Sequence, residues 1–140
     1  FLVVNADVWM DFDATALAVR AGKLPPRCAH LLFAANPPHH RAGDFALCGE
    51  RVVPAGPDRP SVTYTGVGAY RRDFFDDADD AAGSGPLRPF FERAIADGRL
   101  FGEWHEGEWV DVGTPGRLEK LRAEVSLQSQ PGGTRPDRGC

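Results

Sequence analysis

The chain has 140 residues and a formal net charge of −4, with 42% hydrophobic and 26% charged residues. These values suit one globular domain and argue against a fibrous or largely disordered protein. The charge offers no general basic surface for nucleic acid, and no stretch approaches the ~20 apolar residues of a membrane span. Three cysteines at unrelated spacings indicate reduced thiols. We therefore expect a cytoplasmic protein with neither a nucleic-acid nor a membrane partner.

The chain opens on an apolar run, FLVVNADV, at residues 1–8. This pattern predicts a buried strand that delivers Asp7 to the edge of a sheet. Open α/β sheets bind ligands at such carboxyl ends. A buried central strand needs neighbours on both sides, and nothing precedes Phe1. We therefore expect the sequence to be part of a longer protein.

The next segments alternate between turn and apolar patterns. Residues 9–13 predict a turn, with Asp13 as the N-cap of a short helix over residues 14–21 that Gly22 ends. The apolar residues 28–35 predict a second buried strand. The order strand, helix, strand favours a βαβ unit and a largely parallel sheet.

The rest of the chain predicts shorter elements in a mixed order. We expect a hairpin at 44–48 and 51–53, a strand at 61–70 and an acidic surface loop at 73–80. A helix should follow from Pro86 to Gly98, and then strands at 100–105 and 108–112 around a turn. The last elements are a helix after Thr114 with Leu118, Leu121 and Val125 on its inner face, and a disordered tail at 131–140.

Two aspartates stand at expected strand ends beside small residues, Asp7 and Asp111. A pair of carboxylates is the usual protein contribution to a Mg²⁺ site. From spacing alone, the alternative that each caps a helix or ends a strand stays open. The adjacent His39 and His40 follow two prolines; we expect them at a surface or pocket rim, and a metal pair is the alternative.

Five separated motifs carry a resemblance to a known family. They are FLVVNADVW at 1–9, NPPHHRAGDF at 36–45, YTGV at 64–67, GE at 102–103 and WVDVGT at 109–114. Together they resemble the sugar-1-phosphate nucleotidylyltransferases, and within them most closely the N-acetylmuramate 1-phosphate uridylyltransferases and mannose-1-phosphate guanylyltransferase-like proteins. The resemblance covers about residues 1–125, in order and at plausible spacings.

The resemblance implies a fold and a domain division. It implies an α/β fold, a partial Rossmann-like, GT-A-like nucleotidyltransferase with a mixed sheet flanked by helices and a small β-hairpin insertion. Residues 1–130 would be the C-terminal part of a single nucleotidyltransferase domain, its metal and sugar-phosphate half. The family's glycine-rich N-terminal signature, which holds the triphosphate and the base, is absent from these 140 residues. We therefore expect the isolated chain to be inactive.

The resemblance also implies an activity and a set of site residues. The activity is transfer of a nucleoside monophosphate from a nucleoside triphosphate to a sugar 1-phosphate, making UDP-N-acetylmuramate or a GDP-mannose type of product. The implied site residues are Asp7 and Asp111 for catalytic Mg²⁺, and Gly43 (through its N–H), Thr65, Gly66, Trp109 and Glu103 for the sugar phosphate.

One small departure and two alternatives remain. Ala6 stands where the family usually has glycine, which adds a methyl group near the expected metal. One alternative is a non-catalytic, sugar-phosphate-binding regulatory module, although a regulatory copy has no need of both aspartates. The other is a truncated product that does not fold stably, because its exposed sheet edge favours aggregation.

Overall fold

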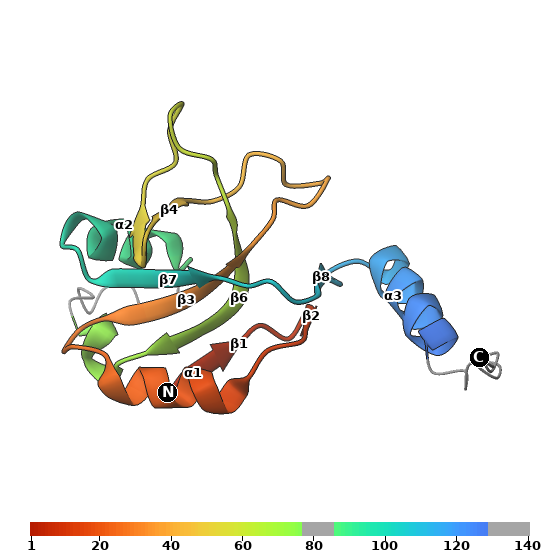
Figure 1. Cartoon of the computed structure of the whole chain (residues 1–140), viewed down its shortest axis with the longest axis horizontal. Helices are drawn as coiled ribbons and strands as arrows, with labels where there is room; N and C mark the ends of the chain where they lie inside the picture. Colours follow the sequence, from red (N-terminus) through yellow and green to blue (C-terminus); the bar gives the residue numbers. More distant parts are fainter. Residues whose placement is uncertain (77–85, 129–140) are drawn as a thin grey trace, which may run out of the picture.

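The structure, a computed structural model, describes residues 1–76 and 86–128. Its elements, in chain order, are β1 (Leu2–Val4), β2 (Val8–Met10), α1 (Ala14–Lys23), β3 (Ala29–Ala34), β4 (Ala46–Cys48), β5 (Arg51–Val53), β6 (Thr63–Tyr70), the 3₁₀ helix η1 (Arg72–Phe75), α2 (Arg88–Ala96), β7 (Leu100–Trp104), β8 (Trp109–Asp111) and α3 (Pro115–Gln128). A six-stranded sheet has the order β1-β6-β3-β7-β5-β4, and β2 pairs with β8 in a separate two-stranded sheet (Figure 1).

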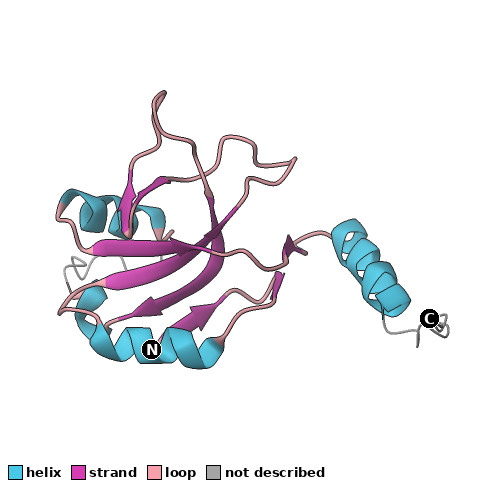
Figure 2. Cartoon of the chain, in the orientation of Figure 1, coloured by secondary structure: helices cyan, strands magenta, loops and turns pink. Residues whose placement is uncertain are grey.

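Strand β3 lies at the centre of the core, and all six of its residues are buried. Alternate side chains of a strand point to opposite faces. Leu31 and Phe33 accordingly pack in one cluster with Phe91 of α2, whereas Leu32 packs in a second cluster with Leu17 of α1. The predicted second buried strand is therefore confirmed, and helices cover both faces of the sheet (Figure 2).

The predicted mixed sheet flanked by helices is confirmed, but the expectation that it is largely parallel is wrong. Among the strands of the described residues, only β3 and β7 pair in parallel, and β6 lies antiparallel between β1 and β3. Local patterns predict strands, but a strand from much later in the chain inserts between the two that were expected to be neighbours. The predicted hairpin is confirmed, because β4 and β5 pair antiparallel.

The N-terminal segment differs from its prediction. Instead of one buried strand over residues 1–8, there are two short strands separated by a turn at Ala6 and Asp7. Strand β1 lies at the edge of the described sheet, and Val4 is 51% exposed. The predicted turn at residues 9–13 is also wrong in its first part, because pairing with β8 holds Val8–Met10 extended.

The two strands predicted around Gly107 both form, as β7 and β8, but they do not pair with each other. Strand β7 belongs to the large sheet, whereas β8 belongs to the small one. Residues 105–108 therefore carry the chain from one sheet to the other. This crossing brings β8 beside β2, which follows Asp7 directly.

The start of α1 was predicted better than its end. Asp13 caps α1 as predicted, since its Oδ1 accepts the N–H of Ala16 at 2.9 Å. The helix then continues through Gly22 to Lys23, two residues beyond the predicted end at residue 21. In α3, Leu121 is buried as predicted, but Val125 is 37% exposed. The predicted tail and residues 77–80 of the acidic loop lie outside the described residues. Residues 73–75 of that loop belong instead to η1, where Phe74 is buried, so the prediction of a surface loop is wrong there.

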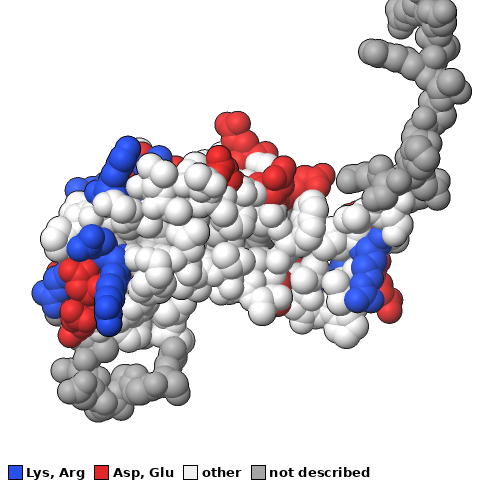
Figure 3. Space-filling view, turned by 90° about the horizontal axis from the view of Figure 1, so that it is seen from below, with Lys and Arg blue, Asp and Glu red and all other residues white. Residues whose placement is uncertain are grey.

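The surface agrees with the small net charge. On the face drawn in Figure 3, Lys and Arg lie interspersed with Asp and Glu and form no broad basic field. None of the helices in the described part of the chain has the length and apolar character that a membrane span requires.

Candidate active site

The pairing of β2 with β8 brings Asp7 and Asp111 together. Val8 and Asp111 are partners in this ladder, and the Val112 N–H donates to the Asp7 carbonyl at 2.8 Å. Gly113 shows how near the two carboxylates are. A Cβ placed on Gly113 would lie 3.0 Å from Asp111 Oδ1 and 3.2 Å from Asp7 Oδ2. The two carboxylates therefore converge on one small space beside a residue that has no side chain.

Three groups contact the Asp111 carboxylate. Its Oδ1 accepts the Gly113 N–H at 2.8 Å and lies 3.2 Å from an Arg117 Nη, while its Oδ2 lies 3.1 Å from His39 Nε2. Burial alone would raise the pKa of Asp111, but the Gly113 N–H, His39 and Arg117 together lower it below its usual value. Asp111 is therefore ionised at neutral pH.

The two aspartates lie at a cleft of about 300 Å³ between the loop before β4, the first half of β6 and the small sheet. Most of its lining is polar or aromatic. Its side chains include those of Asn5, Asp7, His39, His40, Tyr64, Thr65, Trp109 and Asp111, with Gly66 beside them. Three of the residues expected to bind the sugar phosphate, Thr65, Gly66 and Trp109, thus share one cleft with both expected metal ligands.

The cleft wall is held by hydrogen bonds of these same residues. The Thr65 hydroxyl donates to the Leu32 carbonyl at 2.9 Å, and Trp109 Nε1 donates to the Thr65 carbonyl at 2.9 Å. Gly66 has a φ of 83°, and a Cβ there would lie 2.7 Å from Asn5 Nδ2. Glycine is required at this point because a side chain would collide with Asn5.

Two expected sugar-phosphate residues do not join the cleft. The Glu103 carboxylate in β7 lies 2.9 Å from Arg20 and 3.4 Å from His30, on the side of the sheet that α1 covers. The Gly43 N–H donates to the His40 carbonyl at 3.2 Å, within the loop. Neither residue lines the space that holds Asp7 and Asp111. A sugar-phosphate role for either one stays a prediction that this arrangement does not support.

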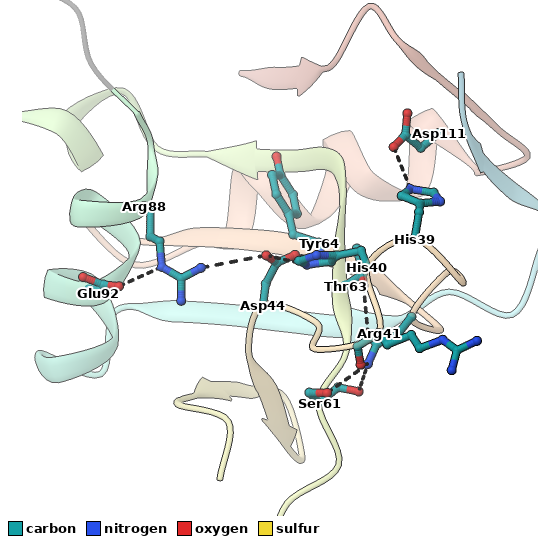
Figure 4. A network of polar contacts seen from close by, with 11 residues as sticks. His39, His40, Arg41, Asp44, Ser61, Thr63, Tyr64, Arg88, Glu92 and Asp111 are labelled. Atoms are coloured by element: carbon teal, nitrogen blue, oxygen red, sulfur yellow. Dashed lines mark hydrogen bonds and ion pairs between the residues drawn. The ribbon is translucent and has the colours of Figure 1, made fainter. Parts of the chain in front are cut away.

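The two histidines of the Pro-Pro-His-His segment both line the cleft, and each faces a carboxylate (Figure 4). His39 faces Asp111, and His40 Nε2 lies 3.1 Å from Asp44 Oδ1. Their expected place at a pocket rim agrees with this geometry. Sequence analysis missed Arg117, which contacts Asp111 from the first turn of α3. Its position three residues after the helix N-cap was the available signal.

Curated relatives match most of the chain. It is 40% identical over 130 residues to the N-acetylmuramate α-1-phosphate uridylyltransferase of Neisseria meningitidis serogroup B, covering 88% of this chain and 54% of that protein. It is 34% identical over 134 residues to the protein of the same name from Caulobacter vibrioides, covering 89% of this chain and 53% of that protein. The chain thus spans about half the length of the curated relatives it matches. No family model matches it.

Solved structures share the fold at low sequence identity. A UTP-bound UGPase from Acinetobacter baumannii matches with a TM-score of 0.66 and 14% identity, over 94% of this chain and 52% of that one. A Bacillus anthracis protein that carries the name glucose-1-phosphate thymidylyltransferase also matches with a TM-score of 0.66, at 17% identity, over 95% of this chain and 56% of that one. The chain is therefore similar to the N-acetylmuramate α-1-phosphate uridylyltransferases over about half of their length, and it shares the fold of the sugar-1-phosphate nucleotidylyltransferases.

Proposed function

We propose that the protein to which this chain belongs transfers a uridylyl group from UTP to a sugar 1-phosphate in the cytoplasm and releases pyrophosphate. The observation that carries this proposal is the convergence of Asp7 and Asp111 at a cleft whose wall includes Thr65 and Trp109. The names of the two curated relatives support uridine as the base and N-acetylmuramate 1-phosphate as the sugar substrate.

The same two aspartates are proposed to hold Mg²⁺. Within the described part of the chain, no three His, Cys, Asp or Glu side chains gather into a complete metal site. A pair of carboxylates without a third ligand suits Mg²⁺, which keeps several waters and takes its remaining oxygens from substrate phosphates. Gly113 places no side chain between Asp7 and Asp111, although an Arg117 Nη lies 3.2 Å from the position that a Cβ would take. When bound, Mg²⁺ would neutralise negative charge on the phosphates.

In the proposed reaction, the residues of this chain mainly position the sugar 1-phosphate. An oxygen of the sugar 1-phosphate forms a bond to the α-phosphorus of UTP, the bond from that phosphorus to the bridging oxygen breaks, and pyrophosphate leaves. The second pKa of a phosphate monoester is about 6, so the attacking oxygen is already deprotonated at neutral pH. No side chain has to act as a base. Thr65, Gly66 and Trp109 would instead hold the sugar phosphate in line.

The proposed site is divided along the chain. We propose that residues 1–130 form the metal and sugar-phosphate half of one nucleotidyltransferase domain. Groups that bind the triphosphate and the base would then lie in the part of the protein that corresponds to the other half of its relatives. The isolated chain is accordingly proposed to bind a sugar 1-phosphate and Mg²⁺ without turning over.

A pyrophosphate-release assay tests the proposal. The complete protein is incubated with Mg²⁺, with UTP or GTP, and with N-acetylmuramate 1-phosphate or mannose 1-phosphate. We expect release with UTP and N-acetylmuramate 1-phosphate, and none from the 140-residue chain alone. Release with GTP and mannose 1-phosphate alone would reassign both substrates. No release with any pair would reject nucleotidyl transfer.

A further inference from the structure

The cleft lining has few side chains that can carry a positive charge, although the substrate proposed above is anionic. It contains the carboxylates of Asp7 and Asp111, and among its described residues only His39 and His40 can carry a positive charge. N-acetylmuramate 1-phosphate differs from N-acetylglucosamine 1-phosphate by a lactyl ether, which adds a carboxylate. A site that accepts this second anion needs a donor for it, because an unpaired buried charge is costly.

The two histidines are not equivalent as donors. His39 faces Asp111, so its ring is engaged at the proposed metal site. His40 instead faces Asp44, which does not line the cleft. In the part of the chain that the structure describes, the His40 ring makes its hydrogen bond through Nε2. Its Nδ1 is therefore left for a ligand.

Asp44 is held firmly enough to orient the His40 ring. Its Oδ2 accepts the Tyr64 N–H at 2.9 Å, and its own N–H donates to the Val62 carbonyl at 2.8 Å. Arg88 of α2 approaches Oδ1 to 4.0 Å (Figure 4). A carboxylate that binds one ring nitrogen fixes the orientation of an imidazole. The other ring nitrogen can then donate a hydrogen bond to a ligand.

The loop that carries His40 is also fixed. The His40 N–H donates to the Pro37 carbonyl at 2.9 Å, which closes a four-residue turn with Pro38 and His39 at its centre. Asn36, at the start of this loop, donates to the Ser61 carbonyl at 3.1 Å and accepts from the Thr63 hydroxyl at 2.8 Å. The ring is thus anchored from both its backbone and its Nε2, so little freedom is lost when a ligand binds.

We propose that His40, oriented by Asp44, binds the carboxylate of an acidic sugar 1-phosphate and selects it over the same sugar without that carboxylate. This inference rests on the proposed function, which supplies the sugar 1-phosphate. A site built to pair with a polar group rejects the analogue that lacks it, since its own donor is then left without a partner. His40 is the specificity-determining residue here, and Asp44 is a positioning residue.

Calorimetric titration of the 140-residue chain in Mg²⁺ tests the inference. N-acetylmuramate 1-phosphate and N-acetylglucosamine 1-phosphate are the two probes. We expect the first to bind about tenfold more tightly, the effect of one hydrogen bond to a charged group. His40→Gln should remove this preference and leave the affinity for N-acetylglucosamine 1-phosphate unchanged. Arg41→Gln is the matched control, because it removes an exposed neighbouring charge whose side chain points away from Asp44 (Figure 4); it should keep the preference.

The nitrogen chemical shifts of the His40 ring, measured by NMR, give a second test. If His40 had only a structural role, these shifts would not change when a ligand binds. N-acetylmuramate 1-phosphate should shift the Nδ1 resonance, and N-acetylglucosamine 1-phosphate should not. Asp44→Asn should reduce the preference and the shift together. Equal binding of the two probes by the unaltered chain, or a preference that survives in His40→Gln, would overturn the inference and leave the proposed function standing. Binding of neither probe would reject the proposed sugar-phosphate site itself, and the inference with it.

Discussion

His39 Nε2 lies 3.1 Å from Asp111 Oδ2, although 72 positions separate the two residues in the chain. The contact joins the loop after β3 to the end of β8 across the mouth of the cleft. With Gly113 and Arg117 on Oδ1, both oxygens of Asp111 have partners. A cation that binds Asp111 therefore shares the carboxylate with these groups or displaces one of them.

Asp111→Asn should weaken divalent-cation binding to the chain by at least about tenfold, because the amide brings no negative charge to the ion. Mn²⁺ titration followed by electron paramagnetic resonance measures this without requiring turnover. Asp58→Asn, in an exposed loop away from the cleft, is the control and should bind as the unaltered chain does. Equal Mn²⁺ affinity in all three proteins would remove Asp111 from the metal site.

Asp13→Ala should lower the free energy of unfolding by about 1 kcal/mol, since it removes the side-chain acceptor for the Ala16 N–H at the start of α1. Urea unfolding followed by circular dichroism provides the measurement. Asp58→Ala removes an exposed aspartate of the same charge and should change little. If the two substitutions cost the same, the cap contributes nothing beyond its charge.

Gly66→Ala should destabilise the chain strongly, by about 2 kcal/mol or more, because the residue has positive φ and its new Cβ would meet Asn5 at 2.7 Å. Gly22→Ala is the matched control within α1, where no atom lies within 4 Å of an added Cβ. That change should instead stabilise the helix by roughly 0.5–1 kcal/mol. The thermal denaturation midpoint should therefore fall in Gly66→Ala and rise in Gly22→Ala. A Gly66→Ala variant as stable as the parent would contradict the close packing of Asn5 against Gly66.

Stability should fall as the pH drops below the ordinary His pKa of 6.5, partly because of His30. Burial, with help from Arg20, outweighs the pull of Glu103 and lowers the pKa of His30 in the folded chain. Below pH 6.5 the unfolded chain therefore binds a proton that the folded chain does not, so this contribution is fully present above 6.5 and is lost as the pH falls.

Urea unfolding of the chain and of His30→Leu, repeated from about pH 8 to about pH 5, isolates this contribution. The difference in stability between the two proteins should change across this range, with the parent losing more stability toward acid pH. A constant difference would mean that His30 titrates alike in the folded and unfolded chains.

Some features of the fold can be predicted from a few neighbouring residues in the sequence. The continuous apolar run around Leu31 predicts a strand buried on both faces, because only such a strand hides every side chain. Asp13 predicts a helix start, because its side chain reaches an N–H three residues away. The motifs around Asp7 and Asp111 likewise stand in the sequence as separate strings.

The assembly of the site was decided by pairings between distant segments. Residues 100–112 predict two strands around a turn, and the local sequence does not tell whether these strands pair with each other. In the structure, β8 leaves β7 and pairs with β2. That pairing sets Asp7 beside Asp111, whereas Glu103 lies beside Arg20 and His30 outside the cleft.

The sequence by itself thus determined the buried strand, the helix caps and the identity of the two aspartates, because apolar patterning and capping act over a few residues. Only the tertiary structure decided that β6 separates β1 from β3, that β8 meets β2, and that His39 and His40 each face a carboxylate. Strand pairing depends on which backbone edges remain available after the core has packed, and that is a property of the whole chain.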